Sequence, residues 1–152
     1  MYDATVTIFN RYESYLGVTW YPSVLQNANL LIDKASIVAK YGEESKDAAV
    51  LNVKINLFDK SISGSNGKRW LPPKEWDSQL NDEMDKYVTF SGGQKFDFFF
   101  LGEWQYANPI LDSDYGIRGF YDYMVNKYDY VFAVTSVSGP FTAIPHFEIT
   151  GR

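Results

Sequence analysis

The chain has 152 residues, of which 45% are hydrophobic and 22% are charged, and its formal net charge is −5. These values are typical of one folded globular domain, so we expect a single domain over residues 1–152 and exclude a mainly disordered chain. No run of residues approaches the roughly 18 apolar positions of a membrane-spanning helix, and the N-terminus shows no secretory signal pattern.

The residue types present exclude several kinds of chemistry. The chain has no cysteine, so disulfides, thiolate metal sites and cysteine nucleophiles are excluded. Its one histidine, His146, would have to serve any Ser-His-Asp mechanism alone. The negative charge argues against general nucleic-acid binding. We therefore expect no enzymatic activity and no cofactor.

The first half of the chain has the clearest strand patterns. Thr5–Phe9 places Val6 and Ile8 on one side. In Val50–Phe58, apolar residues alternate with polar ones, which is typical of a strand with one face in a core. Further short strands are expected at Val18–Tyr21, Ala28–Ile32 and Ser36–Lys40.

Two features follow the Val50–Phe58 strand. Asp59–Arg69 is polar and rich in Gly and Ser, so we expect an irregular loop there. Leu71-Pro72-Pro73 predicts a short helical turn, because proline is tolerated in a first turn, with Trp76 and Leu80 facing inward together.

The middle of the chain predicts a hairpin. Tyr87–Phe90 and Gln94–Leu101 flank the turn Ser91-Gly92-Gly93. The second strand is apolar on both faces: Phe96, Phe98 and Phe100 share one face, while Phe99 and Leu101 share the other with Asp97. Such a strand is either covered from two sides or contacts a partner chain.

One amphipathic helix is predicted near the C-terminal end. Its apolar stripe has the helical period and consists of Ile117, Phe120, Tyr121, Met124, Val125 and Tyr128. Ser113 or Asp114 is expected to cap its start, and Lys127 suits its last turn.

The last strands are expected at Tyr130–Val137, ended by Gly139-Pro140, and at Phe147–Thr150. These nine short strands and one helix predict a mostly β fold with a minor α component. The expected architecture is a small β-barrel or sandwich with one amphipathic helix packed on it.

No motif in the chain predicts catalysis. Gly64-Ser65-Asn66-Gly67-Lys68-Arg69 is only superficially similar to a phosphate-binding loop, because the first glycine and the magnesium-binding Ser or Thr are missing. Clustered carboxylates, such as Asp112 with Asp114, are better explained as helix caps and solvated loop charges. A structural or interfacial role is favoured for His146.

The 11 Phe, 12 Tyr and 4 Trp residues are the unusual part of the composition. One interpretation is a platform for sugar rings, formed by Trp20, Tyr21, Trp70, Trp76, Trp104 and Tyr106. The interpretation that we favour is an aromatic core together with aromatic anchors at subunit contacts. The predicted contact residues combine the polar loop with nearby aromatics: Ser63, Asn66, Lys68, Arg69, Trp70, Trp104 and Tyr106.

The order of several motifs resembles a known family. The opening ATVTIFNRY, the segment WLPPKEW at residues 70–76, the strand KYVTF at 86–90 and the ending PHFEITGR carry this resemblance. They are similar to small minor structural proteins of tailed bacteriophages and prophages of Gram-positive hosts, encoded in the head–tail connection region. The segment Glu103–Asp114 and the helix after it have no clear counterpart in that family.

The resemblance implies a non-catalytic ring subunit of the phage neck, of the head-closure (stopper) or tail-completion type. The implied homo-oligomer is a sixfold or twelvefold ring around the DNA channel, in a virion assembled in the bacterial host cytoplasm. Its implied neighbours are a portal or adaptor protein on the head side and a tail-terminator or tail tube protein on the tail side. As a hypothesis, Asp82, Glu83 and Asp85 face passing double-stranded DNA, whose phosphates they would repel. The alternative function is a carbohydrate-binding module, and a small hydrolase is a third, weaker hypothesis.

Overall fold

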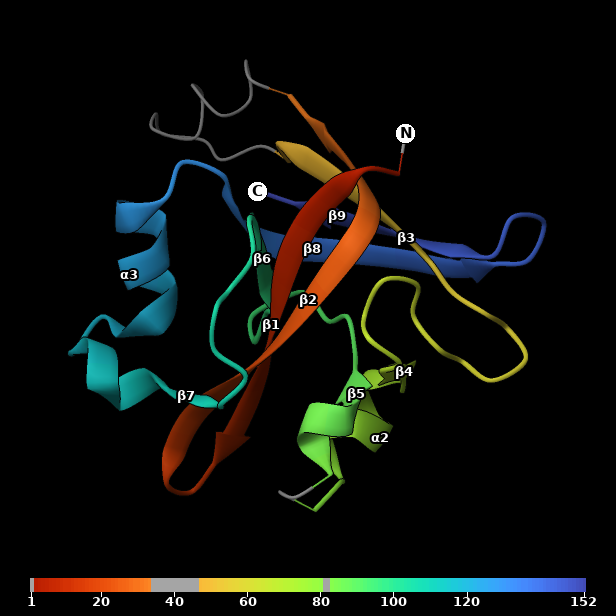
Figure 1. Cartoon of the computed structure of the whole chain (residues 1–152). Helices are drawn as coiled ribbons and strands as arrows, with labels where there is room; N and C mark the ends of the chain where they lie inside the picture. Colours follow the sequence, from red (N-terminus) through yellow and green to blue (C-terminus); the bar gives the residue numbers. More distant parts are fainter. Residues whose placement is uncertain (1, 34–46, 81–82) are drawn as a thin grey trace.

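Six antiparallel strands close into a barrel in the computed structural model, which describes residues 2–33, 47–80 and 83–152 (Figure 1). The strand order is β1-β6-β8-β9-β3-β2, and β2 pairs with β1 to complete the closure. The mostly β prediction is confirmed, and the structure is a barrel. The six strands are β1 (Ala4–Ser14), β2 (Gly17–Ile32), β3 (Ala49–Lys54), β6 (Phe98–Leu101), β8 (Val131–Phe141) and β9 (His146–Gly151).

Smaller elements are attached to this barrel. Strand β7 (Ile110–Leu111) pairs with β2, and β4 (Arg69–Trp70) pairs in parallel with β5 (Tyr87–Val88). The described residues contain two short α-helices and two 3-10 helices, which are α2 (Pro73–Asp77), η1 (Met84–Lys86), η2 (Asp112–Tyr115) and α3 (Gly119–Lys127).

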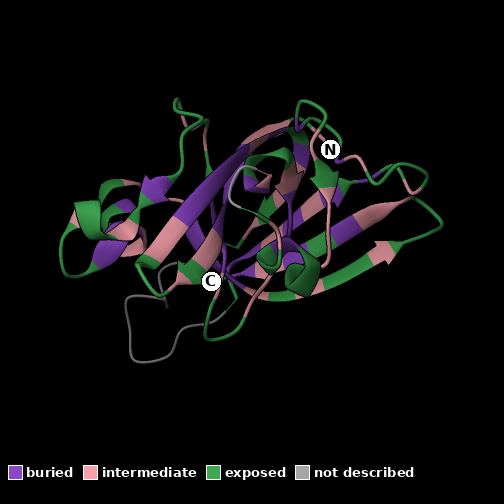
Figure 2. Ribbon diagram, turned by 90° about the horizontal axis from the view of Figure 1, so that it is seen from below, coloured by how far each residue is buried: buried purple, intermediate pink, exposed green. Residues whose placement is uncertain are grey.

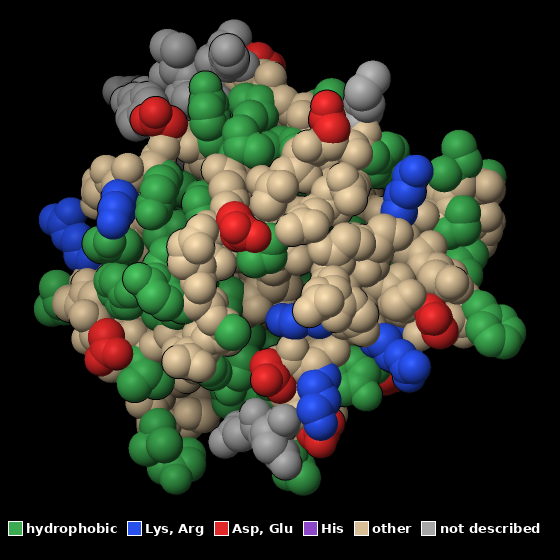
Figure 3. Space-filling model, viewed as in Figure 1, with side chains coloured by type: hydrophobic (Ala, Val, Ile, Leu, Met, Phe, Trp, Pro, Cys, Tyr) green, Lys and Arg blue, Asp and Glu red, His purple; other side chains and the backbone are tan. Residues whose placement is uncertain are grey.

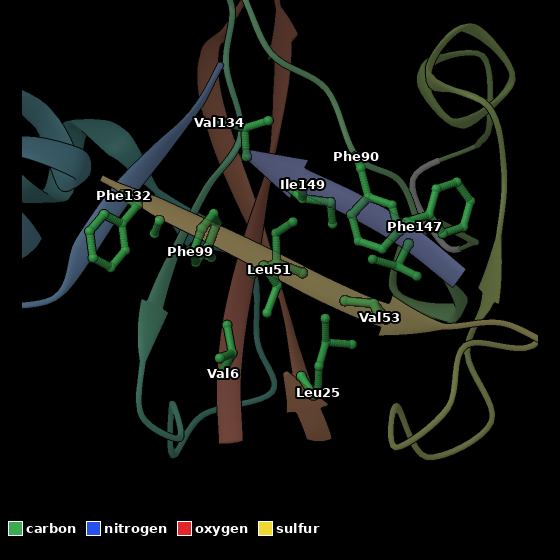
Figure 4. Packing of buried hydrophobic residues seen from close by; sticks show 14 of the residues in the cluster. Val6, Leu25, Leu51, Val53, Phe90, Phe99, Phe132, Val134, Phe147 and Ile149 are labelled. Carbon is green, nitrogen blue, oxygen red and sulfur yellow. The ribbon is translucent and has the colours of Figure 1, made fainter. Parts of the chain in front are cut away.

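The barrel interior and the space under α3 hold two separate apolar clusters. Leu51, Phe99 and Phe147 belong to the interior cluster (Figure 4). Phe98 and Phe100 point the other way, into a cluster that includes Phe120 and Met124 of α3. Of the two alternatives for the Phe-rich strand, coverage from two sides is therefore found for Phe98–Phe100, while Leu101 is exposed. Burial follows the barrel strands, whereas the loops around them are exposed (Figure 2).

Strand β2 is longer than the sequence pattern predicts. Val18–Tyr21 and Ala28–Ile32 are parts of one continuous strand, because the residues between them, including the buried Leu25, keep their pairing with β1. Pro22 is tolerated because β7 pairs only with residues 19–20 of β2 and β3 only with residues 29–32. The strand predicted at Ser36–Lys40 lies outside the described residues.

Two predictions are wrong, one about a hairpin and one about the end of a strand. Tyr87–Phe90 does not form a hairpin with Gln94–Leu101: β5 pairs with β4, while β6 begins at Phe98 and pairs with β1 and β8. Strand β8 also does not end at Val137. It continues through a cis Gly139–Pro140 bond to Phe141, where a register shift lets the proline sit beside β9 alone.

The helices are confirmed, but some of their details are wrong. Helix α2 ends at Asp77, so Trp76 is buried whereas Leu80 is exposed. Helix α3 begins at Gly119 with Arg118 as its N-cap, and neither Ser113 nor Asp114 caps it. Ile117 therefore lies outside the helix and is fully exposed, while Lys127 occupies the last turn as expected.

Candidate interaction surface

The β1–β2 hairpin extends beyond the barrel as an arm, defined here as residues 10–21. Strand β1 pairs with β6 only from Val6 to Phe9, but its ladder with β2 continues to Ser14 and Gly17. In Figure 1 the arm is the hairpin that projects to the lower left. The barrel therefore presents a two-stranded projection at one end.

The tip of the arm carries large apolar side chains in water. Tyr15 is 96% exposed and Leu16 is 82% exposed. Hydrophobic side chains protrude at this end of the molecule in Figure 3, which has the same viewpoint as Figure 1. Adjacent exposed apolar groups on a projection make this tip a candidate contact surface.

A groove runs beside the arm. Its volume is about 1050 Å³, and its walls include Tyr15, Leu16 and Val18 on the arm and Pro109 and Leu111 on the facing segment. Leu111 is half exposed. The tip and this groove together make one mainly apolar surface, which also includes the polar Ser14, Thr19, Asp112 and Ser113 and which we call the arm surface.

Aromatic packing braces the base of the arm. Trp76 of α2 is buried, and its ring meets the Tyr21 ring edge-on with centroids 5.7 Å apart. The Tyr12 ring meets Trp76 in the same way at 6.3 Å. Burial raises the pKa of the Tyr21 hydroxyl, and the charge of Asp85 raises it further. These ring contacts therefore hold the barrel end of the arm against α2.

Hydrogen bonds hold one predicted contact loop against β2. This loop contains Ser63, Asn66, Lys68 and Arg69. The Gln26 backbone N–H donates to the Gly64 carbonyl at 3.0 Å, and Ile62 and Ser65 are buried. The half-buried Lys68 ammonium donates to the Pro22 carbonyl at 3.0 Å and to Ser23 Oγ at 2.9 Å. Ser63, Asn66 and Arg69 remain exposed.

The predicted contact aromatics lie in two different places. Trp70 packs on the barrel cluster, with its ring 5.0 Å from that of Phe147. Trp104 and Tyr106 lie on the α3 side, where the Trp104 ring stands edge-on to Phe120 at 5.4 Å. Tyr106 is 68% exposed beside it. The structure therefore does not bring all seven predicted contact residues together.

Of the predicted channel acids, Asp85 lies in η1, just before β5, which pairs with Arg69 and Trp70 of β4. Glu83 is half buried and pairs with Lys86 at 3.2 Å, while Asp85 is exposed. Burial lowers the pKa of Lys68, and the charge of Asp85 partly opposes that shift. Asp82 lies outside the described residues. On the face drawn in Figure 3, acidic and basic side chains are interspersed.

The residues considered for chemistry have structural contacts. His146 stacks on Phe141 with ring centroids 5.0 Å apart and lies 3.4 Å from Glu148. Asp112 fastens α3 to the barrel. In the part of the chain that the structure describes, no three His, Cys, Asp or Glu side chains are grouped so that they could hold a metal ion. Among the same residues, no helix has the length and apolarity needed to cross a membrane.

Sequence reasoning missed the arm tip. Ser14 pairs with Gly17, so Tyr15 and Leu16 form a two-residue turn with two large apolar side chains at its apex. The signal that could have indicated it is this apolar pair at a turn, where Gly, Asn, Asp and Ser usually stand.

The fold and the arm surface define a small, closed antiparallel β-barrel protein with a projecting, apolar-tipped hairpin. The chain belongs to the family described as "Family of unknown function (DUF6751)", whose model matches residues 1–152. No curated protein and no solved structure matches the chain.

Proposed function

We propose that this chain is a structural protein of a tailed-phage neck, a non-catalytic ring subunit of the head-closure or tail-completion type. The arm surface supports this proposal most directly, because it offers apolar contact area on a projection that a ring neighbour can reach. The partners proposed are sister copies, a portal or adaptor protein on one side and a tail-terminator or tail tube protein on the other. The protein would act in the virion after synthesis in the host cytoplasm.

The chemistry of the arm tip fits protein contacts. Tyrosine is enriched among the interface residues that contribute most to binding, and covering a side chain of this size contributes roughly 1.5–3 kcal/mol. A tip on one subunit that meets a different surface on the next forms a heterologous contact, and repeated heterologous contacts form a ring when the rotation between neighbours closes on itself. The barrel supplies the rigid wall that such a ring needs.

The acidic residues near η1 fit the second part of the proposal. Asp85 lies just before β5, which pairs with Arg69 and Trp70 of β4, so this carboxylate lies on the same part of the molecule as the exposed Arg69. If this part lines a channel, its carboxylates repel the DNA phosphates and oppose tight binding, which allows the DNA to pass.

The structure gives little support to a carbohydrate-binding module. Trp20, Tyr21 and Trp76 are all buried, so they offer no exposed face on which a sugar ring could stack. Of the six aromatics considered for that platform, Tyr106 is the one that is largely exposed.

Incorporation into phage particles tests the proposal. We expect a tagged wild-type chain to co-purify with particles and the double variant Tyr15→Ser/Leu16→Ser to be lost from them. Ile144→Ser is the matched control, because Ile144 is 65% exposed at the β8–β9 turn, on the opposite side of the molecule in Figure 1. Equal incorporation of all three chains would contradict the role of the arm, and absence of the wild type from particles would contradict the proposed function.

A further inference from the structure

A buried carboxylate lies where the arm leaves the barrel. The β1–β6 ladder ends at the pair Phe9–Phe98, and the next residue of that segment is Asp97. Beyond the end of the ladder, the Asp97 side chain replaces the backbone as acceptor: Asp97 Oδ1 accepts a hydrogen bond from the Arg11 backbone N–H at 2.8 Å. On the β6 side, the first residues of the arm are therefore held by a side chain, while on the other side their ladder with β2 continues.

The second oxygen of Asp97 extends this connection. Asp97 Oδ2 accepts hydrogen bonds from Asn10 Nδ2 at 3.0 Å and from the Ser91 backbone N–H at 2.8 Å. Asn10 Nδ2 also donates to the Thr89 carbonyl at 2.6 Å, and the Thr89 N–H donates to Asn10 Oδ1 at 3.3 Å. We call this set the clamp: Asn10, Thr89, Ser91 and Asp97, with the backbone of Arg11.

The clamp is buried, and its hydrogen bonds do not fully replace the hydration that its polar groups lose. Asn10, Thr89 and Asp97 are each at most 2% exposed. All three groups that donate to Asp97 are N–H groups without formal charge, and a buried carboxylate needs strong partners to offset its lost hydration. Thr89 Oγ1 is buried without a hydrogen-bond partner, and a cavity of about 280 Å³ adjoins Thr89 and Asp97. Such a site is costly to keep closed.

We propose that the clamp is a pH-dependent opening point at the base of the arm, where residues 10–11 separate from residues 89–97 while the six barrel strands stay paired. The barrel does not depend on the clamp, because the backbone ladders of β3 with β9 and of β8 with β9 use no clamp side chain. The device goes beyond the proposed function and stands whatever partner the arm meets.

The direction of the pH effect follows from burial. Burial raises the pKa of Asp97 from 3.8 to about 7, although its three N–H donors oppose the shift. In an opened clamp the carboxyl meets water and its pKa returns toward the ordinary value. Protonated Asp97 therefore favours the closed clamp, and ionisation as the pH rises toward 7 favours the open one.

Charged side chains from α2, β1 and the segment before β6 lie around the clamp. Asp77, at the end of α2, raises the pKa of Asp97 slightly, and burial raises the pKa of Asp77 itself. Arg11 and Glu13 of β1 and Lys95 line the same cavity, and Glu13 pairs with Lys95 at 2.8 Å and with Arg11 at 3.2 Å. Asp77 is thus a second group whose titration the experiment has to distinguish from that of Asp97.

Amide hydrogen exchange of the full chain, followed by NMR between pH 5 and 8.5, tests the proposal. We expect the Arg11 and Ser91 amides to exchange at least about a hundredfold faster than those of Leu51 and Ile149 in the barrel ladder, as local opening requires. After correction for intrinsic exchange, their opening constant should rise about tenfold per pH unit below pH 7 and level off above it.

Two variants assign the effect. Asp97→Asn should abolish the pH dependence at Arg11 and Ser91, whereas Asp77→Asn should keep it. Opening constants equal to those of Leu51 and Ile149, or independent of pH in the wild type, would overturn the proposal. The wild-type series decides the question alone, so an Asp97→Asn chain that does not fold leaves the test intact.

Discussion

Trp20 Nε1 donates a hydrogen bond to Asp112 Oδ1 over 2.8 Å, which ties β2 to the segment that leads into α3. The same oxygen accepts the Phe120 backbone N–H at 2.9 Å, so one carboxylate serves a barrel strand and the first turn of the helix. Asp112, which lies outside α3, therefore accepts the N-terminal backbone hydrogen bond that the sequence assigns to Ser113 or Asp114.

Removing this carboxylate should loosen α3. We expect Asp112→Ala to lower the free energy of unfolding by about 1–3 kcal/mol, because the buried Trp20 N–H loses its acceptor. Asp114→Ala, which removes an exposed carboxylate two residues away, should change it by less than about 0.5 kcal/mol. Urea denaturation followed by tryptophan fluorescence measures both values, and equal values would show that the Trp20–Asp112 contact contributes nothing.

The loop at residues 59–69 gives a second matched pair. Gly64 and Gly67 both have left-handed backbone, with φ of +75° and +85°. A Cβ on Gly64 would lie 1.8 Å from the Gln26 carbonyl oxygen, whereas a Cβ on Gly67 meets nothing within 4 Å. Gly67→Ala should therefore cost about 1 kcal/mol from backbone strain alone.

Gly64→Ala should cost at least about 2 kcal/mol more, because the loop has to lift off β2 as well. The same urea titration measures the difference between the two variants. If both alanines cost the same, the loop is not fastened to β2 in the way that the Gln26–Gly64 contact indicates.

Global stability should depend on pH through Asp97. Because the pKa of Asp97 is raised in the folded state, its contribution is fully present below its ordinary value of 3.8 and is lost as the pH rises to about 7. The slope within this window is at most about 1.4 kcal/mol per pH unit. The pKa values of Glu13 and Asp59 are lowered by hydrogen bonds, so their effect falls below pH 4.5 and has the opposite sign.

Unfolding midpoints of the wild type and of Asp97→Asn at pH 5 and pH 7.5 measure the pH-dependent contribution of Asp97 to stability. The wild type should be less stable at pH 7.5 than at pH 5, and the variant should show little difference. A wild type that gains stability over this interval would mean that the N–H donors outweigh burial at Asp97.

The channel hypothesis predicts a charge effect. Glu83→Lys/Asp85→Lys should impair DNA retention or ejection in assembled particles, because lysines attract the phosphates that the carboxylates repel. Asp3→Lys is the control, since Asp3 is exposed at the N-terminal end, away from η1 in Figure 1. Unchanged ejection from particles with the double variant would count against a channel position for η1.

Much of the fold can be predicted from periodicity. The alternation over residues 50–55 predicts the buried face of β3, and the Phe98–Phe100 run predicts how its rings divide between two clusters, because side-chain direction follows from strand geometry. The end of β3 is predicted wrongly: the strand stops at Lys54, and Phe58 is exposed. The continuity of β2 could not be predicted. Its middle contains Pro22 and the polar pair Gln26-Asn27, which interrupt the strand pattern, and only pairing with β1 shows that the strand continues.

The candidate sites were less predictable for physical reasons. The clamp joins Asn10 to residues 79 and 87 positions away, and neither strand periodicity nor a local motif encodes such a contact. Asp97 even looks like a solvent-facing position between two phenylalanines. The burial of Trp20 and Trp76 likewise depends on which long-range neighbours cover them, so the sequence left the sugar-platform alternative open.

A cryo-EM map of the tailed-phage particles that contain this chain tests the central claim most directly. We expect density for the barrel in a closed ring between the portal side and the tail, with Tyr15 and Leu16 of each arm seated against a neighbouring subunit. Particles whose neck lacks the barrel, or a ring in which every arm tip stands free in solvent, would contradict the claim.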